Sequence, residues 1–218
     1  MKTIRNPRFF SLGIAALAFF LALPAGLYAG DAALDEKVKS FLARTAGTWY
    51  DMNVPEVDGR ALYDLVVQNR YQKALEIGTS TGRSGIYIAW GLSKTGGRLI
   101  TIEIDPSRHR QALANFKEAG LSEFIDARLA DAHSLVKELP GPFDFVFCDA
   151  DKDWYKNYFV DVLPKLTAGG RFAAHNVSGR RGWGTGEFYE YVTSLSSIET
   201  TLSRAPGSSL CVSLKKAK

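Results

Sequence analysis

Residues 73–105 read KALEIGTSTGRSGIYIAWGLSKTGGRLITIEID, and this stretch decides the fold. A short apolar run at 73–78 leads through a glycine-containing turn into a helical pattern at about 82–93, and a second apolar run follows at 98–105. A strand, a helix and another strand in this order are typical of a parallel βαβ unit, because the helix carries the chain back along the sheet. The stretch therefore predicts an α/β protein.

The same alternation continues on both sides of this unit. The other apolar runs that we expect to be strands span 124–131, 143–150, 171–177, 197–204 and 208–214. The other helical patterns span 35–50, 59–69, 106–119, 132–138, 154–166 and 185–195. We expect Gly120 to end the helix 106–119 and the Gly169–Gly170 pair to end the helix 154–166.

These elements predict a doubly wound, mostly parallel, seven-stranded sheet. The last two runs are separated by Ala205, Pro206 and Gly207, which favours a C-terminal antiparallel hairpin. The two helical patterns before residue 73 form an N-terminal helical cap.

The composition is that of a chain able to bury a packed core. Its 218 residues suit one domain at about 150 residues per domain, and 46% of them are apolar while 23% are charged. The formal charge of +4 comes mostly from Lys2, Arg5 and Arg8, and the remaining 24 basic residues nearly balance 23 acidic ones. The chain lacks the concentrated basic surface that nucleic-acid binding requires, and we exclude that class of function.

The first thirty residues have the order of a secretion signal. Three positive charges precede the apolar stretch from Phe9 to Ala29, which contains the helix-breaking Pro24 and is followed by small residues. We expect residues 1–29 to be a signal peptide, or an uncleaved membrane anchor because the stretch is long enough to span a bilayer. Residues 30–218 would then form a periplasmic, secreted or membrane-anchored domain, and only a start assigned too far upstream would leave it in the cytoplasm.

The chain has two cysteines, Cys148 and Cys211. They could form one disulfide in an oxidising compartment. Each lies inside an apolar, strand-like run, where a cysteine usually behaves as a small buried hydrophobic residue. We therefore favour two free thiols.

The turn after the first predicted strand contains two glycines, Gly78 and Gly82. In a parallel sheet, ligands bind at the carboxyl ends of the strands, where Gly78 lets a ligand approach the backbone and Gly82 lets the next helix start close by. A dinucleotide enzyme would have a third glycine where this chain has Ser80, which disfavours a nicotinamide-dependent dehydrogenase. Glu103 ends the second predicted strand, where a carboxylate can accept hydrogen bonds from both hydroxyls of a ribose.

A cluster of charged residues, DADKD at 149–153, follows the fourth predicted strand. The next strand ends with His175 and Asn176, and a parallel sheet brings that end beside Asp149. Oxygen and nitrogen ligands of these types can hold a divalent cation, so Asp149, His175 and Asn176 are candidate metal ligands.

These residues resemble those of a known family, the class I S-adenosylmethionine-dependent O-methyltransferases, and within it the cation-dependent group of catechol and caffeoyl-coenzyme A O-methyltransferases. The resemblance covers roughly 52–215. It implies a Rossmann-like methyltransferase sheet, S-adenosylmethionine as the cofactor, a small-molecule hydroxyl acceptor and a homodimer. The residues that it implies for cofactor binding are Met52, Val54, Glu76, Gly78, Ser80, Gly82, Ser84, Glu103, Asp131 and Asp149.

The resemblance also implies roles for the charged cluster. Lys152 matches the lysine that serves as the general base, and Asp149 and Asn176 match metal ligands. His175, however, stands where the family has a second metal-binding aspartate. A neutral histidine would favour a transition metal over Mg²⁺ and make binding depend on pH; alternatively, it marks a site that has lost its metal.

Two functions from different classes fit this pattern. The first is an O-methyltransferase in which Lys152 takes a proton from an acceptor hydroxyl that is aligned with the methyl donor near a bound cation. The second is an exported, non-catalytic binding domain that keeps the ligand pocket, for which His175 and the export signal are the reasons. In the first case, we expect the loop residues Arg180, Arg181 and Trp183 to shape the acceptor pocket.

Overall fold

The computed structural model describes residues 25–178 and 184–217. Residues 1–24 of the expected leader and the loop residues Arg180, Arg181 and Trp183 lie outside this part of the chain, whereas residues 25–29 of the leader lie in its first helix. Within the two described ranges, no helix is both long enough and apolar enough to cross a membrane.

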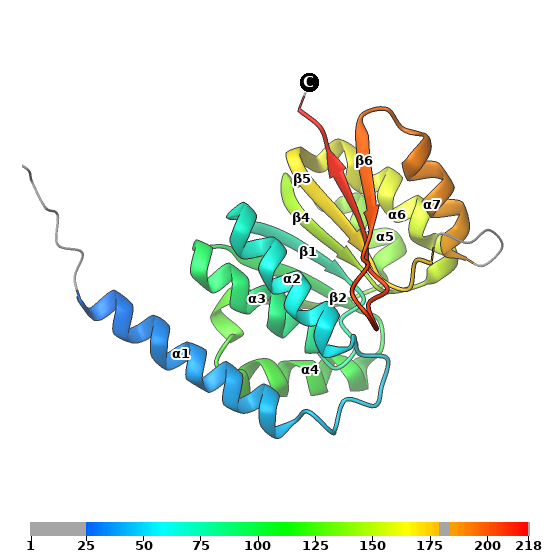
Figure 1. Cartoon of the computed structure of the whole chain (residues 1–218). Coiled ribbons are helices and arrows are strands. Elements are labelled where there is room, and N and C mark those ends of the chain that lie inside the picture. The colour runs from blue at the N-terminus through cyan, green and yellow to red at the C-terminus, as the bar shows by residue number, and fades with distance from the viewer. Residues whose placement is uncertain (1–24, 179–183, 218) are drawn as a thin grey trace, which may run out of the picture.

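Seven strands form one mixed sheet (Figure 1). They are β1 (Lys73–Ile77), β2 (Arg98–Glu103), β3 (Ile125–Leu129), β4 (Phe143–Cys148), β5 (Leu166–Ala174), β6 (Ile198–Leu202) and β7 (Cys211–Lys215). Their order is β3-β2-β1-β4-β5-β7-β6, and β7 runs antiparallel to both of its neighbours. The doubly wound sheet and its terminal hairpin are thus confirmed. Because the strand order reverses between β1 and β4, a ligand crevice is expected at the carboxyl ends of these two strands.

Helices cover both faces of this sheet. They are α1 (Ala25–Arg44), α2 (Glu56–Asn69), α3 (Arg83–Thr95), α4 (Pro106–Ala119), α5 (Ala132–Glu138), α6 (Tyr155–Val162) and α7 (Thr185–Ser194). One face is covered by α2, α3 and α4, with α1 packed against α3 and α4, and the other face is covered by α5, α6 and α7 (Figure 1). The two apolar layers completely bury side chains of the sheet, such as Leu75 on one face and Phe145 on the other.

The N-terminal helices differ from the predicted ones in their bounds. Helix α1 spans Ala25–Arg44 rather than 35–50, and the chain turns after it, with the hydroxyl of Thr45 donating a 2.8 Å hydrogen bond to the Phe41 carbonyl. Helix α2 begins at Glu56 rather than at 59, since Pro55, with φ of −65°, suits the position before a helix.

The segment between β4 and β5 also differs from the prediction. The expected helix 154–166 is divided into a 3₁₀ turn at Lys152–Trp154, helix α6, and a second 3₁₀ turn at Leu163–Lys165. Strand β5 begins at Leu166 rather than at 171, so Gly169 lies inside a strand and does not end a helix. Its φ of +79° accompanies a shift in the register of β5 against β4, as in a β-bulge. Gly120, with φ of +81°, does end α4 as predicted.

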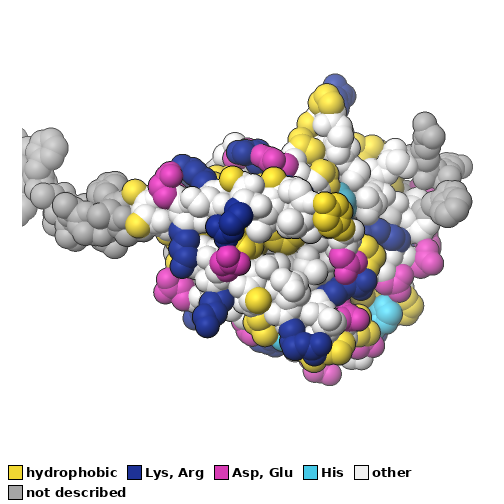
Figure 2. Space-filling model, turned by 90° about the horizontal axis from the view of Figure 1, so that it is seen from below, with side chains coloured by type: hydrophobic (Ala, Val, Ile, Leu, Met, Phe, Trp, Pro, Cys, Tyr) yellow, Lys and Arg dark blue, Asp and Glu magenta, His cyan; other side chains and the backbone are white. Residues whose placement is uncertain are grey.

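Cys148 and Cys211 are free and buried, as the sequence indicated. On the face drawn in Figure 2, acidic and basic side chains are intermixed rather than gathered by sign. This surface reflects the near balance of charges in the chain after residue 8.

Candidate functional site

A cavity of about 240 Å³ lies at the carboxyl ends of β1, β2, β3 and β4. The predicted cofactor residues that line it are Met52, Gly78, Ser80, Glu103, Asp131 and Asp149. A larger cavity of about 660 Å³ lies at the amino ends of the strands, beside Lys73, Arg98 and Phe143. None of the predicted site residues lines that larger cavity. We therefore assign the candidate site to the smaller one.

The glycine turn after β1 forms the floor of this cavity. The backbone amides of Gly78 and Thr79 donate hydrogen bonds of 3.0 and 3.1 Å to the Ile102 carbonyl, which fixes the turn against β2. Gly78 has φ of +95°, and a Cβ at this position would lie 2.8 Å from the carbonyl oxygen of Asp149. The close approach of the β1 and β4 ends therefore requires glycine at position 78.

Glu103 presents a nearly buried carboxylate to the same cavity. It accepts hydrogen bonds from three backbone amides: from Ser80 at 2.7 Å, from Ile104 at 3.1 Å and from Asp105 at 2.9 Å. These bonds hold the carboxylate in place, and a carboxylate can accept about four hydrogen bonds in all. Glu103 can therefore still accept a hydrogen bond from a hydroxyl of a ligand.

Four of the predicted cofactor residues lie behind the cavity wall. They are Val54, Glu76, Gly82 and Ser84. Glu76 is completely buried and accepts a 2.5 Å hydrogen bond from the hydroxyl of Thr101. Its burial raises the pKa to about 8, although hydrogen bonds from Ser84 and Thr101 act in the opposite direction. At neutral pH Glu76 is therefore mostly a neutral acid, buried behind the glycine turn that follows β1.

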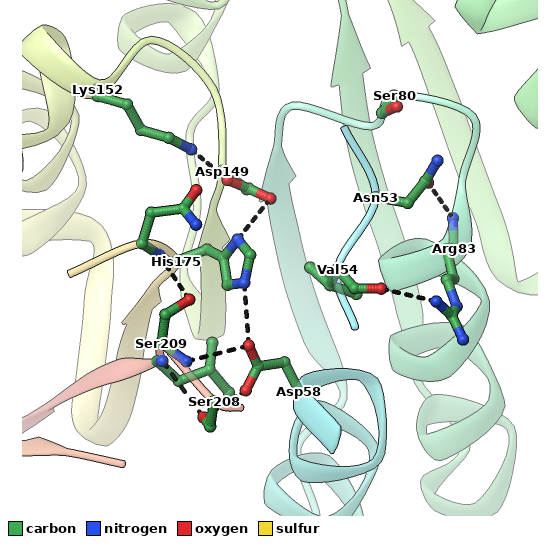
Figure 3. Close-up of polar contacts among 12 residues, drawn as sticks. Asn53, Val54, Asp58, Ser80, Arg83, Asp149, Lys152, His175, Ser208 and Ser209 are labelled. Atoms are coloured by element: carbon green, nitrogen blue, oxygen red, sulfur yellow. Dashed lines mark hydrogen bonds and ion pairs between the residues drawn. The ribbon is translucent and has the colours of Figure 1, made fainter. Parts of the chain in front are cut away.

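The segment before α2 covers one side of the cavity. The hydroxyl of Ser80 donates a 2.6 Å hydrogen bond to the Asp51 carbonyl, and the amide of Asn53 donates one of 2.9 Å to the hydroxyl of Thr81. On α3, Arg83 donates a 3.0 Å hydrogen bond to the Val54 carbonyl (Figure 3). Met52, between these anchors, has φ of +47°, lines the cavity and is 65% exposed.

An aromatic wall closes the cavity beside α5. Asp131 accepts a 2.9 Å hydrogen bond from the backbone amide of His133 and so begins this helix. The ring of His133 lies 5.7 Å from the ring of Tyr158 with an interplanar angle of 23°. Both residues line the cavity, where His133, stacked on the buried ring of Tyr158, can lie against a planar ligand group.

A row of alternating charges lies at the ends of β4 and β5 (Figure 3). Lys152 donates one short hydrogen bond to Oδ1 of Asp149 and another, of 3.0 Å, to the hydroxyl of Tyr155. Oδ2 of Asp149 lies 3.1 Å from Nδ1 of His175, and Nε2 of His175 lies 3.0 Å from Oδ2 of Asp58. Two cations and two carboxylates thus alternate along the row.

Asp58 lies in the first turn of α2 and is completely buried. It accepts hydrogen bonds from the hydroxyl of Ser208 and, at 3.3 Å, from the backbone amide of Ser209. Burial alone would raise the pKa of Asp58, but hydrogen bonds from His175, Ser208 and Ser209 outweigh burial and lower it. The same contacts hold the chain in a turn before β7, which begins at Cys211 rather than at 208.

His175 is also buried and lies between the two carboxylates. Burial would lower its pKa, but the contacts with Asp149 and Asp58 raise it to about 9. The ring lies between the two carboxylates, with Nε2 in hydrogen-bond contact with Asp58 at 3.0 Å and with Nδ1 3.1 Å from Oδ2 of Asp149, although Nδ1 makes no hydrogen bond within the described part of the chain. His175 is therefore an imidazolium at neutral pH, with no lone pair for a metal ion.

These contacts do not fit a divalent cation. Both oxygens of Asp149 face cations of the chain, His175 is protonated, and Asn176 is exposed. Among residues 25–178 and 184–217, no three histidine, cysteine, aspartate or glutamate side chains form a group that could hold a metal ion. The structure brings Asp149 and His175 together as predicted, but as an ion pair.

The sequence patterns did not point to several residues of the site, including Tyr158 in the aromatic wall. Arg108 and His133 line the cavity, and Asp58 anchors His175. His133 could have been suspected because it follows Asp131 at the start of a predicted helix. No local pattern marks Asp58, which lies 117 positions from His175 in the sequence.

Sequence comparison connects the chain with enzymes of one kind. A family profile described as O-methyltransferase matches residues 29–182. A catechol O-methyltransferase of Niastella koreensis is 38% identical over 130 residues, which are 58% of this chain and 58% of that enzyme. A caffeoyl-CoA O-methyltransferase of Populus kitakamiensis is 28% identical over 154 residues, covering 68% of this chain and 65% of the relative. These matches span less than two thirds of either curated relative.

Solved structures agree with the sequence matches. An O-methyltransferase from Bacillus cereus, in complex with SAH, is 26% identical, covers 84% of this chain and 91% of its own, and has a TM-score of 0.66. An O-methyltransferase of tomaymycin synthesis from Streptomyces achromogenes, in complex with SAM, is 25% identical with the same coverage and a TM-score of 0.69.

Proposed function

The chain belongs to the O-methyltransferase family, and we propose that it transfers a methyl group from S-adenosylmethionine to a hydroxyl of a small, catechol-like molecule. The observation that carries this proposal is the cavity at the carboxyl ends of the strands, with the Gly78 turn and Glu103 on one side and Lys152 and Asp149 close to the other. A methyl donor and a proton acceptor would thus lie in one cleft.

The described residues fit S-adenosylmethionine. Gly78 leaves the room beside the backbone that a Cβ would fill, Glu103 would accept the ribose hydroxyls, and His133 and Tyr158 would lie against the adenine. Met52 would lie over the bound molecule from the segment before α2. When bound, the cofactor supplies the methyl group, whose bond to the sulfonium sulfur breaks with the electron pair remaining on sulfur.

Lys152 is the proposed catalytic residue. Asp149 and Tyr155 hold its Nζ at the end of β4 through two hydrogen bonds. In its amine form, Nζ takes the proton of the acceptor hydroxyl as the new bond between carbon and oxygen forms. General-base catalysis of this kind typically contributes about 100-fold to 10,000-fold. No step of the proposal uses a divalent cation.

Two measurements on the full chain test the function. Calorimetric titration should detect micromolar binding of S-adenosylmethionine, and incubation with catechol or caffeoyl-CoA should yield the methylated product and S-adenosylhomocysteine. A folded protein that binds no S-adenosylmethionine would overturn the proposal. A protein that binds the cofactor but turns over no acceptor would favour a non-catalytic binding domain.

Variants of two lysines separate catalysis from binding. The substitution Lys152→Ala should lower turnover by about 100-fold or more while cofactor affinity stays within about threefold. Lys156→Ala is the matched control, because Lys156 lies one helical turn further along and pairs instead with Glu187. Equal activity of the two variants would exclude Lys152 as the base.

We also propose that the N-terminal segment exports the domain or anchors it to the membrane, and that the chain forms a homodimer. The order of charges, apolar residues and small residues in 1–29 supports export. N-terminal sequencing of protein recovered from the periplasm, medium and membrane tests the first proposal, and sedimentation equilibrium tests the second.

A further inference from the structure

The row formed by Lys152, Asp149, His175 and Asp58 is balanced in charge without any added ion. Two carboxylates face two cations, and each ion pair joins neighbours in the row. His175 and Asp58 are buried, and the side chain of Asp149 is only 11% exposed. A divalent cation placed among them would leave the row with a charge of about +2 in a partly dry site, which is costly.

Each oxygen of Asp149 already lies beside a cation of the chain. Oδ1 accepts the hydrogen bond from Lys152, and Oδ2 lies 3.1 Å from the ring of His175. A metal ion bound to Asp149 would lie close to both of these cations and would be repelled by them. Asp149 therefore already has the positive neighbours that a metal ion would otherwise provide.

Asp58 holds the histidine from the opposite side. Its contact of 3.0 Å with Nε2, together with its hydrogen bonds from Ser208 and Ser209, fixes the ring between α2, β5 and the turn before β7 (Figure 3). The ring cannot turn away to expose a nitrogen lone pair without leaving Asp58 as a buried carboxylate that has lost its cation. This loss would cost several kcal/mol.

We infer that the side chain of His175, held between Asp58 and Asp149, takes the place of a divalent cation, so that this transferase works without a metal ion. The inference rests on the proposed function and deepens it. Positive charge from His175 lies beside Asp149, next to the cleft, and Lys152 becomes positive as its amine takes the proton, so both can stabilise the negative charge that develops on the acceptor oxygen. Asp58 acts as a positioning residue for this charge.

Metal binding tests the inference independently of activity. The full chain is titrated with Mn²⁺ and free ion is followed by electron paramagnetic resonance, with and without S-adenosylmethionine. We expect no binding below about millimolar Mn²⁺. Binding in the micromolar range would overturn the inference, whether or not the protein is an active transferase.

Activity supplies a second readout. Methylation of catechol should change less than twofold between buffer containing EDTA and buffer containing Mg²⁺ or Mn²⁺. A loss of tenfold or more in EDTA that either cation restores would overturn the inference. If neither buffer supports turnover, the proposed function fails, while Mn²⁺ binding still decides whether the row excludes a cation.

A reversed charge at position 175 tests the role of the histidine. We expect H175D combined with D58N, which removes the carboxylate that would be left unpaired, to bind Mn²⁺ at least tenfold more tightly than the wild type. The control H109D places the same carboxylate on α4, outside the cavity lining, and should bind no Mn²⁺. Failure of the folded double variant to bind Mn²⁺ would show that His175 is not what excludes the cation. The single variant H175D keeps the carboxylate of Asp58. If H175D folds, it should bind Mn²⁺ at least as tightly as the double variant does.

Discussion

The two halves of the site each bury an acid, and the two acids behave in opposite ways. In the half formed by β1 and β2, Glu76 has hydroxyl partners and its pKa is raised to about 8. In the half formed by α2, β4 and β5, Asp58 faces His175 and its pKa is lowered. Both side chains are completely buried, so burial alone does not decide whether an acid is charged. The partner decides it, because a cation stabilises the carboxylate and a hydroxyl does so much less.

The halves consequently fix their polar groups by different means. The β1 and β2 half uses the backbone of the Gly78 turn and one carboxylate, Glu103, fixed by amides. The other half uses side-chain charges fixed by one another. The first depends on exact backbone shape, whereas the second depends on keeping every charge paired.

The largest effect should come from breaking the charged half. Asp58→Ala leaves an imidazolium and the hydroxyl of Ser208 without their buried partner and should lower the free energy of unfolding by about 3 to 5 kcal/mol. Asp58→Asn keeps an acceptor for Ser208 and should cost less. Urea denaturation at pH 7 measures both. A loss of under 1 kcal/mol for Asp58→Ala would mean that the ion pair contributes little.

The next effect tests the point where the two halves touch. Gly78→Ala adds a Cβ against the Asp149 carbonyl at a positive φ and should cost about 2 to 4 kcal/mol and abolish cofactor binding. Gly169→Ala is the matched control, because φ there is +79° but nothing lies within 4 Å of the added Cβ. It should cost only about 1 to 2 kcal/mol. Equal losses for the two variants would show that backbone strain, and not the contact with β4, sets the requirement.

The third effect is a dependence of stability on pH. Because the pKa of Glu76 is raised from 4.5 to about 8, the folded state keeps a proton that the unfolded state releases between these pH values. Stability should therefore fall as pH rises through this window, by at most about 1.4 kcal/mol per pH unit. Glu76→Gln has no proton to lose, so its stability relative to the wild type should rise from pH 5 to pH 8.

Urea denaturation at four pH values measures this difference. Because the pKa of His175 is raised to about 9, the wild type should also lose stability as the pH rises from 6.5 to about 9. The Glu76→Gln variant should show this same loss, since it keeps His175. Glu199→Gln, at an exposed position of β6, should leave the curve parallel to that of the wild type. If the free energy of unfolding of Glu76→Gln changed with pH in parallel with that of the wild type, Glu76 would be charged in the folded state.

The smallest effect concerns the segment that covers the cavity. Ser80→Ala removes the hydrogen bond to the Asp51 carbonyl but keeps the amide that binds Glu103, so it should cost about 1 kcal/mol. We also expect a rise of a few fold in KM for S-adenosylmethionine. Ser194→Ala, which removes a hydroxyl bonded within α7, is the control and should leave KM unchanged. Calorimetry and steady-state kinetics measure these changes.

Local sequence features predicted the fold and several of the residues that line the cavity. The βαβ rhythm, Gly78 with Ser80, and Glu103 lie within a short stretch of chain, and each follows directly from a strand end. In the other half, the sequence predicted that Asp149 and His175 lie together, but it gave no sign that Asp58 lies beside them. The boundary of β5 was also missed, since a glycine pair can end a helix or form a bulge, and only pairing with β4 distinguishes the two.

The sequence by itself determined the order of strands and helices, the glycine turn and the polar residues at the strand ends, because these depend on periodicity and on neighbours along the chain. Only the tertiary structure decided which buried groups are charged. The pKa of Glu76, Asp58 or His175 depends on which groups surround it, and the partners of His175 come from α2 and β4. Folding brings these partners together, and it also places Lys152 and His175 beside Asp149.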